Sequence, residues 1–124
     1  MLFSSNAVSS NVLDVGRLLR MRDYLDAGTF LDIVEEYKLR LQSLLNELDC
    51  AKNSPVDLRR IGHDLINVAG TLGMSELMLA GERLTHVIRS GRHFETLTYL
   101  AEDIMAAGAR ALYAIEKYLP NAAR

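Results

Sequence analysis

The feature that most constrains the fold of this chain is a helical spacing of apolar residues that recurs along most of its length. In five successive segments, apolar residues stand three or four positions apart, which places them on one face of an α-helix. No segment carries the alternating run of β-branched residues that is typical of a strand. Pro55 and Pro120 both stand where a helix is expected to begin or end. The sequence therefore predicts an all-α protein.

Five helices are expected, a short one followed by four long ones. Their approximate bounds are residues 12–25, 29–49, 54–73, 75–91 and 94–119. Because the connections between the long helices are short, successive helices must run antiparallel. The prediction is an antiparallel up-down four-helix bundle with a short N-terminal leader helix. Residues 1–11 are expected to be loosely ordered, and residues 12–124 to form one helical domain.

Particular residues are expected to start and stop these helices. Ser54 can cap the third helix, with Pro55 at its first helical position. Ser75 is the expected cap of the fourth helix. Gly28 is expected to break the chain and Gly91 to end the fourth helix, because glycine adopts the left-handed conformation without strain.

The composition is that of a globular protein and argues against several function classes. The chain has 124 residues, of which 49% are hydrophobic and 24% charged, enough for one domain with a substantial core. Its net charge of −2 gives no general attraction to nucleic acid or to an anionic membrane. The single cysteine, Cys50, cannot form an internal disulfide, and no segment has the features of a signal peptide or a membrane span. We expect a cytoplasmic protein with no nucleic-acid or membrane partner.

His63 is expected on the face of its helix that points away from the core. The inward stripe of that helix consists of Leu58, Ile61, Leu65, Val68 or Ala69, and Leu72. At 100° per residue, His63 lies about 160° from both Ile61 and Leu65. Histidine changes its charge and nucleophilicity most readily near neutral pH. An outward-facing histidine is therefore a candidate functional group.

The other residues on the face of His63 are unusual for a solvated surface. They are Val56, Arg59, Arg60, Ile66, Asn67 and Gly70, with Asp64 as a flanking carboxylate. Gly62 and Gly70 each cost a helix about 0.5–1 kcal/mol relative to alanine, which favours close approach of a neighbouring helix or of a partner. Two exposed apolar residues beside two arginines predict a docking patch for an anionic group. An ordinary solvated helix face is the alternative.

The order of residues after His63 resembles the signature of histidine-containing phosphotransfer (HPt) domains. The chain has the family's leucine at Leu65, its alanine at Ala69, and its leucine-glycine pair at Leu72 and Gly73. The order of the expected helices extends the resemblance over about residues 12–119. The resemblance implies an HPt-like helical bundle over residues 12–124.

The function that the resemblance implies is phosphotransfer in a two-component phosphorelay. A phosphoryl group would pass between receiver-domain aspartates through a phosphohistidine at His63, so the protein would be a phosphocarrier without turnover of its own. The implied partners are a response-regulator receiver domain, a hybrid sensor histidine kinase, or both. Mg²⁺ is expected on the receiver, this chain needs no cofactor, and a monomer is the simplest state. The residues expected near the phosphoryl group or in docking are Arg59, Arg60, Ile66, Asn67, Gly70, Thr85 and Val56.

Two positions depart from the family pattern and support an alternative. Ile66 stands where the family usually has lysine, and Asn67 where it usually has glycine. Arg59 and Arg60, one turn earlier, offer positive charge instead. Thr85 falls near a family position that often holds a glutamine touching the histidine. The alternative is a degenerate HPt-like adaptor that binds a receiver or kinase domain without efficient transfer.

Other chemistries have weaker support in the sequence. His86 and His93 do not form a metal-ligand spacing with His63, and no Cys/His cluster accompanies them. Cys50 has no nearby histidine that would activate it as a nucleophile. The adjacent carboxylates on the other helices are typical of solvated faces; they are Glu35 with Glu36 and Glu102 with Asp103.

Overall fold

The computed structural model describes residues 11–51, 54–91 and 94–122, which form five α-helices. They are α1 (Val15–Tyr24), α2 (Ala27–Cys50), α3 (Pro55–Leu72), α4 (Ser75–Ser90) and α5 (Phe94–Ala122). Within these residues there is no strand, and no helix is long and apolar enough to cross a membrane. The prediction of an all-α protein is confirmed. The expectation for residues 1–11 falls, apart from Asn11, outside the described residues.

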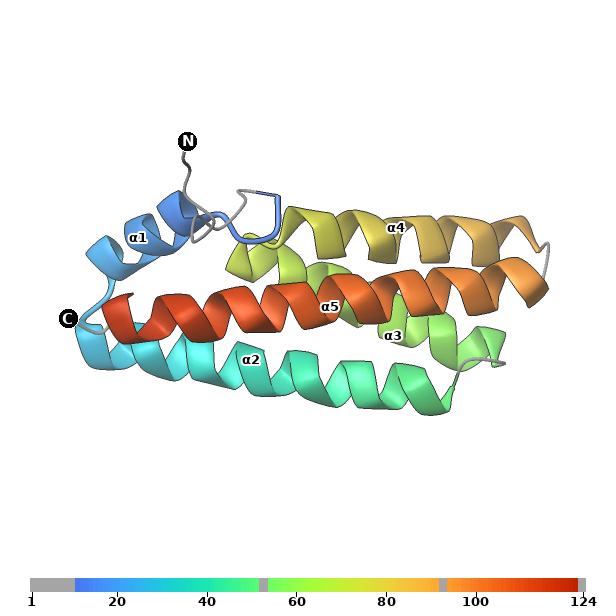
Figure 1. The fold of residues 1–124 in the computed structure, drawn as a ribbon, viewed down its shortest axis with the longest axis horizontal. Helices are drawn as coiled ribbons and strands as arrows, with labels where there is room; N and C mark the ends of the chain where they lie inside the picture. The colour runs from blue at the N-terminus through green and yellow to red at the C-terminus, as the bar shows by residue number, and fades with distance from the viewer. Residues whose placement is uncertain (1–10, 52–53, 92–93, 123–124) are drawn as a thin grey trace, which may run out of the picture.

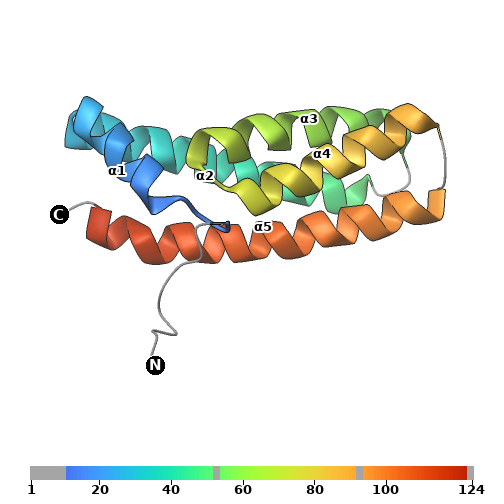
Figure 2. The same ribbon diagram turned by 90° about the horizontal axis from the view of Figure 1, so that it is seen from above.

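The four long helices pack in a closed sequence of neighbours. Each of α3, α4 and α5 packs against the helix before it, and α2 packs against α5. Successive helices from α2 to α5 run in opposite directions (Figure 1). α1 contacts α2 and lies at the end of the molecule where α2 begins and α5 ends (Figures 1 and 2). In this arrangement α3 and α4 are neighbours, and the side of α3 that points away from the core lies next to α4.

The break between α1 and α2 lies earlier than the sequence predicts. Leu25, in extended conformation at φ −115°, ends α1, and Asp26 caps α2 by accepting a hydrogen bond from the Thr29 N–H at 2.8 Å. Hydrogen bonds from Thr29 also hold the pKa of the Asp26 carboxyl below its ordinary value. Gly28 therefore lies inside the first turn of α2, and the expected break at Gly28 is wrong.

Both ends of α3 and the end of α4 agree with the sequence predictions. Ser54 caps α3 by accepting a hydrogen bond from the Asp57 N–H at 3.5 Å, and Pro55 is the first helical residue. Gly73 and Gly91 follow α3 and α4 in the left-handed conformation, at φ 75° and 70°. These residues fix where the two helices end.

The start of α4 differs from the prediction that Ser75 is its cap. Met74 occupies the N-cap position and makes no side-chain capping bond, while Ser75 is the first helical residue. The Glu76 N–H instead donates to the Asn11 carbonyl at 2.7 Å. A distant backbone segment therefore satisfies the N–H group that a capping side chain at position 74 would otherwise satisfy.

The same segment before α1 fastens the turn between α3 and α4. The Asp14 N–H donates to the Gly73 carbonyl at 2.8 Å. A Cβ at Gly73 would lie 3.0 Å from both Asp14 Cβ and Arg17 Cδ. Gly73 is thus required by its backbone conformation and by the close approach of this segment.

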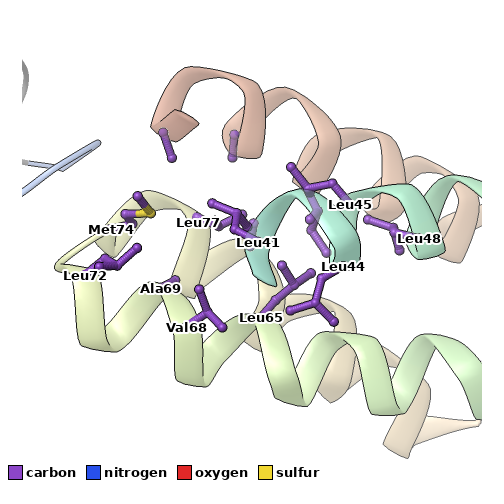
Figure 3. Close-up of a cluster of buried hydrophobic side chains, with 14 of the residues drawn as sticks. Leu41, Leu44, Leu45, Leu48, Leu65, Val68, Ala69, Leu72, Met74 and Leu77 are labelled. Carbon is purple, nitrogen blue, oxygen red and sulfur yellow. The ribbon is translucent and has the colours of Figure 1, made fainter. Parts of the chain in front are cut away.

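The core forms where the apolar faces of the helices meet. Figure 3 shows leucines of α2 facing the apolar residues of α3 and the start of α4. α2 and α5 approach so closely at Gly108 that an added Cβ would lie 2.7 Å from both Leu45 Cδ atoms. The predicted inward residues of α3 are all at most 1% exposed: Leu58, Ile61, Leu65, Val68, Ala69 and Leu72. No polar or charged side chain of the described residues is buried.

Candidate functional site

His63 lies in the middle of α3 with its side chain exposed to solvent. The flanking stripe residues Ile61 and Leu65 are fully buried on the opposite face. Among the described residues, His63 has no hydrogen-bond or ion-pair partner. The prediction that it faces away from the core is confirmed, and its ring is accessible to another molecule.

α3 and α4 lie side by side (Figure 2), and two glycines allow these helices to pack closely near His63. A Cβ at Gly62 would lie 3.0 Å from Thr85 Cγ2. A Cβ at Gly81 would lie 3.1 Å from Ile66 Cγ1. Of the two explanations for Gly62, close helix packing is the one that fits. This packing brings the outer residues of α4 next to the His63 face.

A hollow of about 450 Å³ spans the junction of α3 and α4 at His63. It brings His63 together with the predicted site residues Val56, Arg59, Arg60 and Thr85, and adds Arg89. Sequence reasoning missed Arg89. The available signal was its position four residues after Thr85, one helical turn along the same face of α4.

The three remaining predicted site residues lie outside this hollow. Ile66 is half-buried against Gly81, so the expectation that its side chain is exposed is wrong. Asn67 is exposed but lines a separate hollow of about 360 Å³ between α2 and α3. Gly70 is half-buried, with Met78 Sδ 3.5 Å from where its Cβ would be. The hollow at His63 therefore includes fewer residues of α3 than the helical spacing predicts.

The three arginines at the hollow differ in their ion pairs. Arg60 donates a hydrogen bond to Glu47 of α2 and forms an ion pair with Asp64 at 3.6 Å. The bond to Glu47 and the charges of both carboxylates raise the pKa of Arg60 above its ordinary value. Arg59 and Arg89 have no ion pair with any described residue. Their charges are therefore not neutralised by contact with a carboxylate.

Thr85 contributes less to the hollow than a glutamine would. Its hydroxyl donates to the carbonyl of Glu82 in its own helix at 3.0 Å, and its methyl group faces Gly62. The hydroxyl proton is thus already used, which leaves the oxygen as an acceptor. Thr85 can accept a hydrogen bond from an imidazole N–H, but it does not offer a donor to an anion.

The described residues contain no cluster of three side chains able to hold a metal ion. His86 is exposed on α4, and His93 lies outside the described residues. Cys50 is exposed at the last position of α2, one residue later than the predicted helix end. The arrangement that the described residues do offer is an accessible nucleophilic imidazole beside two unpaired guanidinium groups. Such a site can accept an electrophile and stabilise negative charge on it.

No model of a known protein family matches the sequence, and no curated protein or solved structure matches it in the comparisons made. The resemblance to HPt domains therefore depends on the residues around His63 and on the order of the helices.

Proposed function

We propose that this protein is a histidine phosphotransfer carrier of a two-component phosphorelay, with His63 as its phosphoacceptor. In this proposal α2 to α5 form the antiparallel up-down four-helix bundle of HPt domains, and α1 is the leader helix. The observation that carries the proposal is the exposed imidazole, without a partner among the described residues, in a hollow whose other charged residues are arginines. The carboxylates of Glu47 and Asp64 contact Arg60, and neither lines this hollow.

The reaction is an exchange of one phosphoryl bond for another. A nitrogen lone pair of neutral His63 attacks the phosphorus of an aspartyl phosphate on a receiver domain. The N–P bond forms as the P–O bond to the aspartate breaks, and the carboxylate leaves with that electron pair. The reverse reaction returns the phosphoryl group to a second aspartate. Catalysis of this kind depends mainly on positioning and charge neutralisation, and the receiver would supply Mg²⁺.

The rim of the hollow suits a protein partner. Val56 is 81% exposed although it is apolar, and it lies two turns before His63 on the same face of α3. An exposed apolar residue beside Arg59 and Arg89, which have no ion pair in the part of the chain described, favours a surface with a small apolar contact surrounded by acidic groups. The aspartyl-phosphate site of a receiver domain has this chemistry.

An adaptor that binds a receiver without accepting phosphate is the second candidate. The observation that favours it is the apolar side chain of Ile66, which packs against Gly81. The position three residues after His63 therefore offers no cation to a phosphoryl group. Such an adaptor would retain the docking face around Val56 and Arg59. It would differ from the carrier only in the fate of the phosphoryl group.

The test is transfer from a phosphorylated receiver in the presence of Mg²⁺. We expect the wild-type protein to gain an acid-labile, alkali-stable label, and the His63→Gln variant to gain none. His86→Gln is the matched control, since His86 is also exposed but lies outside the hollow, and it should be labelled like the wild type. Equal labelling of His63→Gln and wild type would exclude the carrier. Receiver binding without any label would favour the adaptor.

A further inference from the structure

The three arginines around His63 are not equivalent, although the sequence gives no reason to separate them. Arg60 is engaged by one carboxylate from α2 and one from its own helix, Glu47 and Asp64. Arg59 and Arg89 are without an ion pair in the described part of the chain. A new anion at His63 can attract them without separating an existing ion pair.

We propose that Arg59 and Arg89 together hold the anionic group on His63, and that Arg60 has the structural role of fastening α3 to α2. This inference rests on the proposed function, because the anion is the phosphoryl group of phosphohistidine. It adds Arg89 to the site and removes Arg60 from direct contact with phosphate.

The two arginines reach the hollow from different helices. Arg59 precedes His63 by four residues and therefore lies one turn away on the same face of α3. Arg89 comes from α4, which the close packing at Gly62 and Gly81 brings alongside. A planar guanidinium group offers paired N–H donors that match phosphate oxygens. Two such groups on neighbouring helices can bind different oxygens of one phosphoryl group.

The positive charges of Arg59 and Arg89 also match the negative charge of a phosphoryl group. A phosphoryl group on a side chain carries about −1.5 to −2 charges near pH 7. Arg59 and Arg89 contribute one positive charge each, while the charge of Arg60 is offset by Glu47 and Asp64. Recruiting Arg60 would require it to leave its ion pairs with Glu47 and Asp64, which makes it a less favourable ligand than Arg59 or Arg89.

Arg89 also lies in the last turn of α4, where a cation stabilises the helix dipole. That role alone would affect the stability of the protein and leave phosphorylation unchanged. Labelling and stability must therefore be measured on the same variants.

The experiment uses phosphoramidate as the phosphoryl donor, so that no receiver contributes charge or contacts. The variants are Arg59→Gln, Arg89→Gln and Arg60→Gln, each compared with wild type by the rate of phosphohistidine formation in ³¹P NMR and by urea unfolding. We expect Arg59→Gln and Arg89→Gln to slow labelling about three- to fivefold each, the upper part of the range for an exposed charged contact. Arg60→Gln should label within about twofold of wild type while unfolding at lower urea, since an exposed ion pair contributes mainly to stability.

The outcomes separate this inference from the proposed function. If wild type forms no phosphohistidine, the carrier function fails and the inference fails with it. If wild type is labelled and both Arg59→Gln and Arg89→Gln are labelled as fast as wild type, only the assignment of the two arginines is overturned. A larger loss of labelling in Arg60→Gln than in the other two would overturn it as well.

Discussion

The close contact of α2 with α5 can be tested by exchanging the sizes of two side chains. Gly108 is buried against Leu45, which is 6% exposed, and an added Cβ would lie 2.7 Å from both Leu45 Cδ atoms and 3.2 Å from Cγ. Gly108→Ala should therefore destabilise the wild-type protein. In a Leu45→Ala background those three carbon atoms are absent, and the same substitution should stabilise it.

The sizes of the effects follow from two opposing contributions. Replacing a helical glycine by alanine gains about 0.8–1.0 kcal/mol of helix propensity. Overpacking a core costs about 1–3 kcal/mol, so Gly108→Ala in wild type should lose about 1 kcal/mol net. Leu45→Ala alone should cost about 2–5 kcal/mol through the cavity that it leaves. Adding Gly108→Ala to it should recover about 1 kcal/mol, which makes the coupling between the two sites about 2 kcal/mol.

The assay is urea unfolding followed by circular dichroism at 222 nm for the four proteins of the double-mutant cycle. Gly70→Ala serves as the control, because its added Cβ would make only an ordinary contact with Met78 Sδ at 3.5 Å, and it should be stabilising. The reasoning is refuted if Gly108→Ala shifts stability in the same direction in both backgrounds, or if the two sites are additive within about 0.5 kcal/mol.

Three further predictions concern the turns, the caps and the site. Gly73→Ala should destabilise the protein by about 1–2 kcal/mol in urea unfolding, because its φ of 75° is strained for alanine; unchanged stability would contradict the backbone assignment. The pKa of Asp26 is lowered by Thr29, so its stabilising effect should be full above the ordinary value of 3.8 and lost as the pH falls through the lower folded value. The stability difference between wild type and Asp26→Ala should accordingly be larger at pH 7 than at pH 2.5, and an equal difference at both would count against this cap. Gly62→Leu should push Thr85 and α4 away from His63 and lower phosphoramidate labelling more than Gly70→Ala does, whereas equal labelling of both would show that the spacing of the helices is unimportant.

The core of α3 illustrates what the sequence is able to predict. Its apolar stripe depends only on the 3.6-residue period, and every residue of that stripe is buried in the structure. The same period correctly turns His63 outward. The start of α3 is equally local, because Ser54 and Pro55 act within their own turn.

Two of the errors lie where a segment distant in the sequence contacts the helix, whereas the error at Gly28 follows from the local cap by Asp26. Ile66 falls on the outer side of an isolated α3, but α4 approaches at Gly81 and half-buries it. At the start of α4, Met74 and not Ser75 occupies the N-cap position, and the Asn11 carbonyl accepts the Glu76 N–H from a segment distant in the sequence. Such contacts depend on how the helices are placed relative to one another. The spacing of apolar residues within one helix carries no information about that placement.

The same limit explains the candidate site. Arg59 and Arg60 are adjacent on α3, yet Glu47 of α2 pairs with Arg60, whereas Arg59 has no ion pair within the described ranges. Arg89 joins the site only because α4 lies against α3. Each distinction depends on a neighbouring helix.

The most direct measurement is to map the phosphoryl group after reaction with a phosphorylated receiver and Mg²⁺. The wild-type protein would be digested under alkaline conditions, analysed by mass spectrometry, and in parallel mixed with fresh unphosphorylated receiver. The expected result is one acid-labile phosphoryl group on His63 that passes on to the fresh receiver. A phosphoryl group on any other residue, or none on His63 although the receiver binds, would contradict the assignment of His63 as the phosphoacceptor.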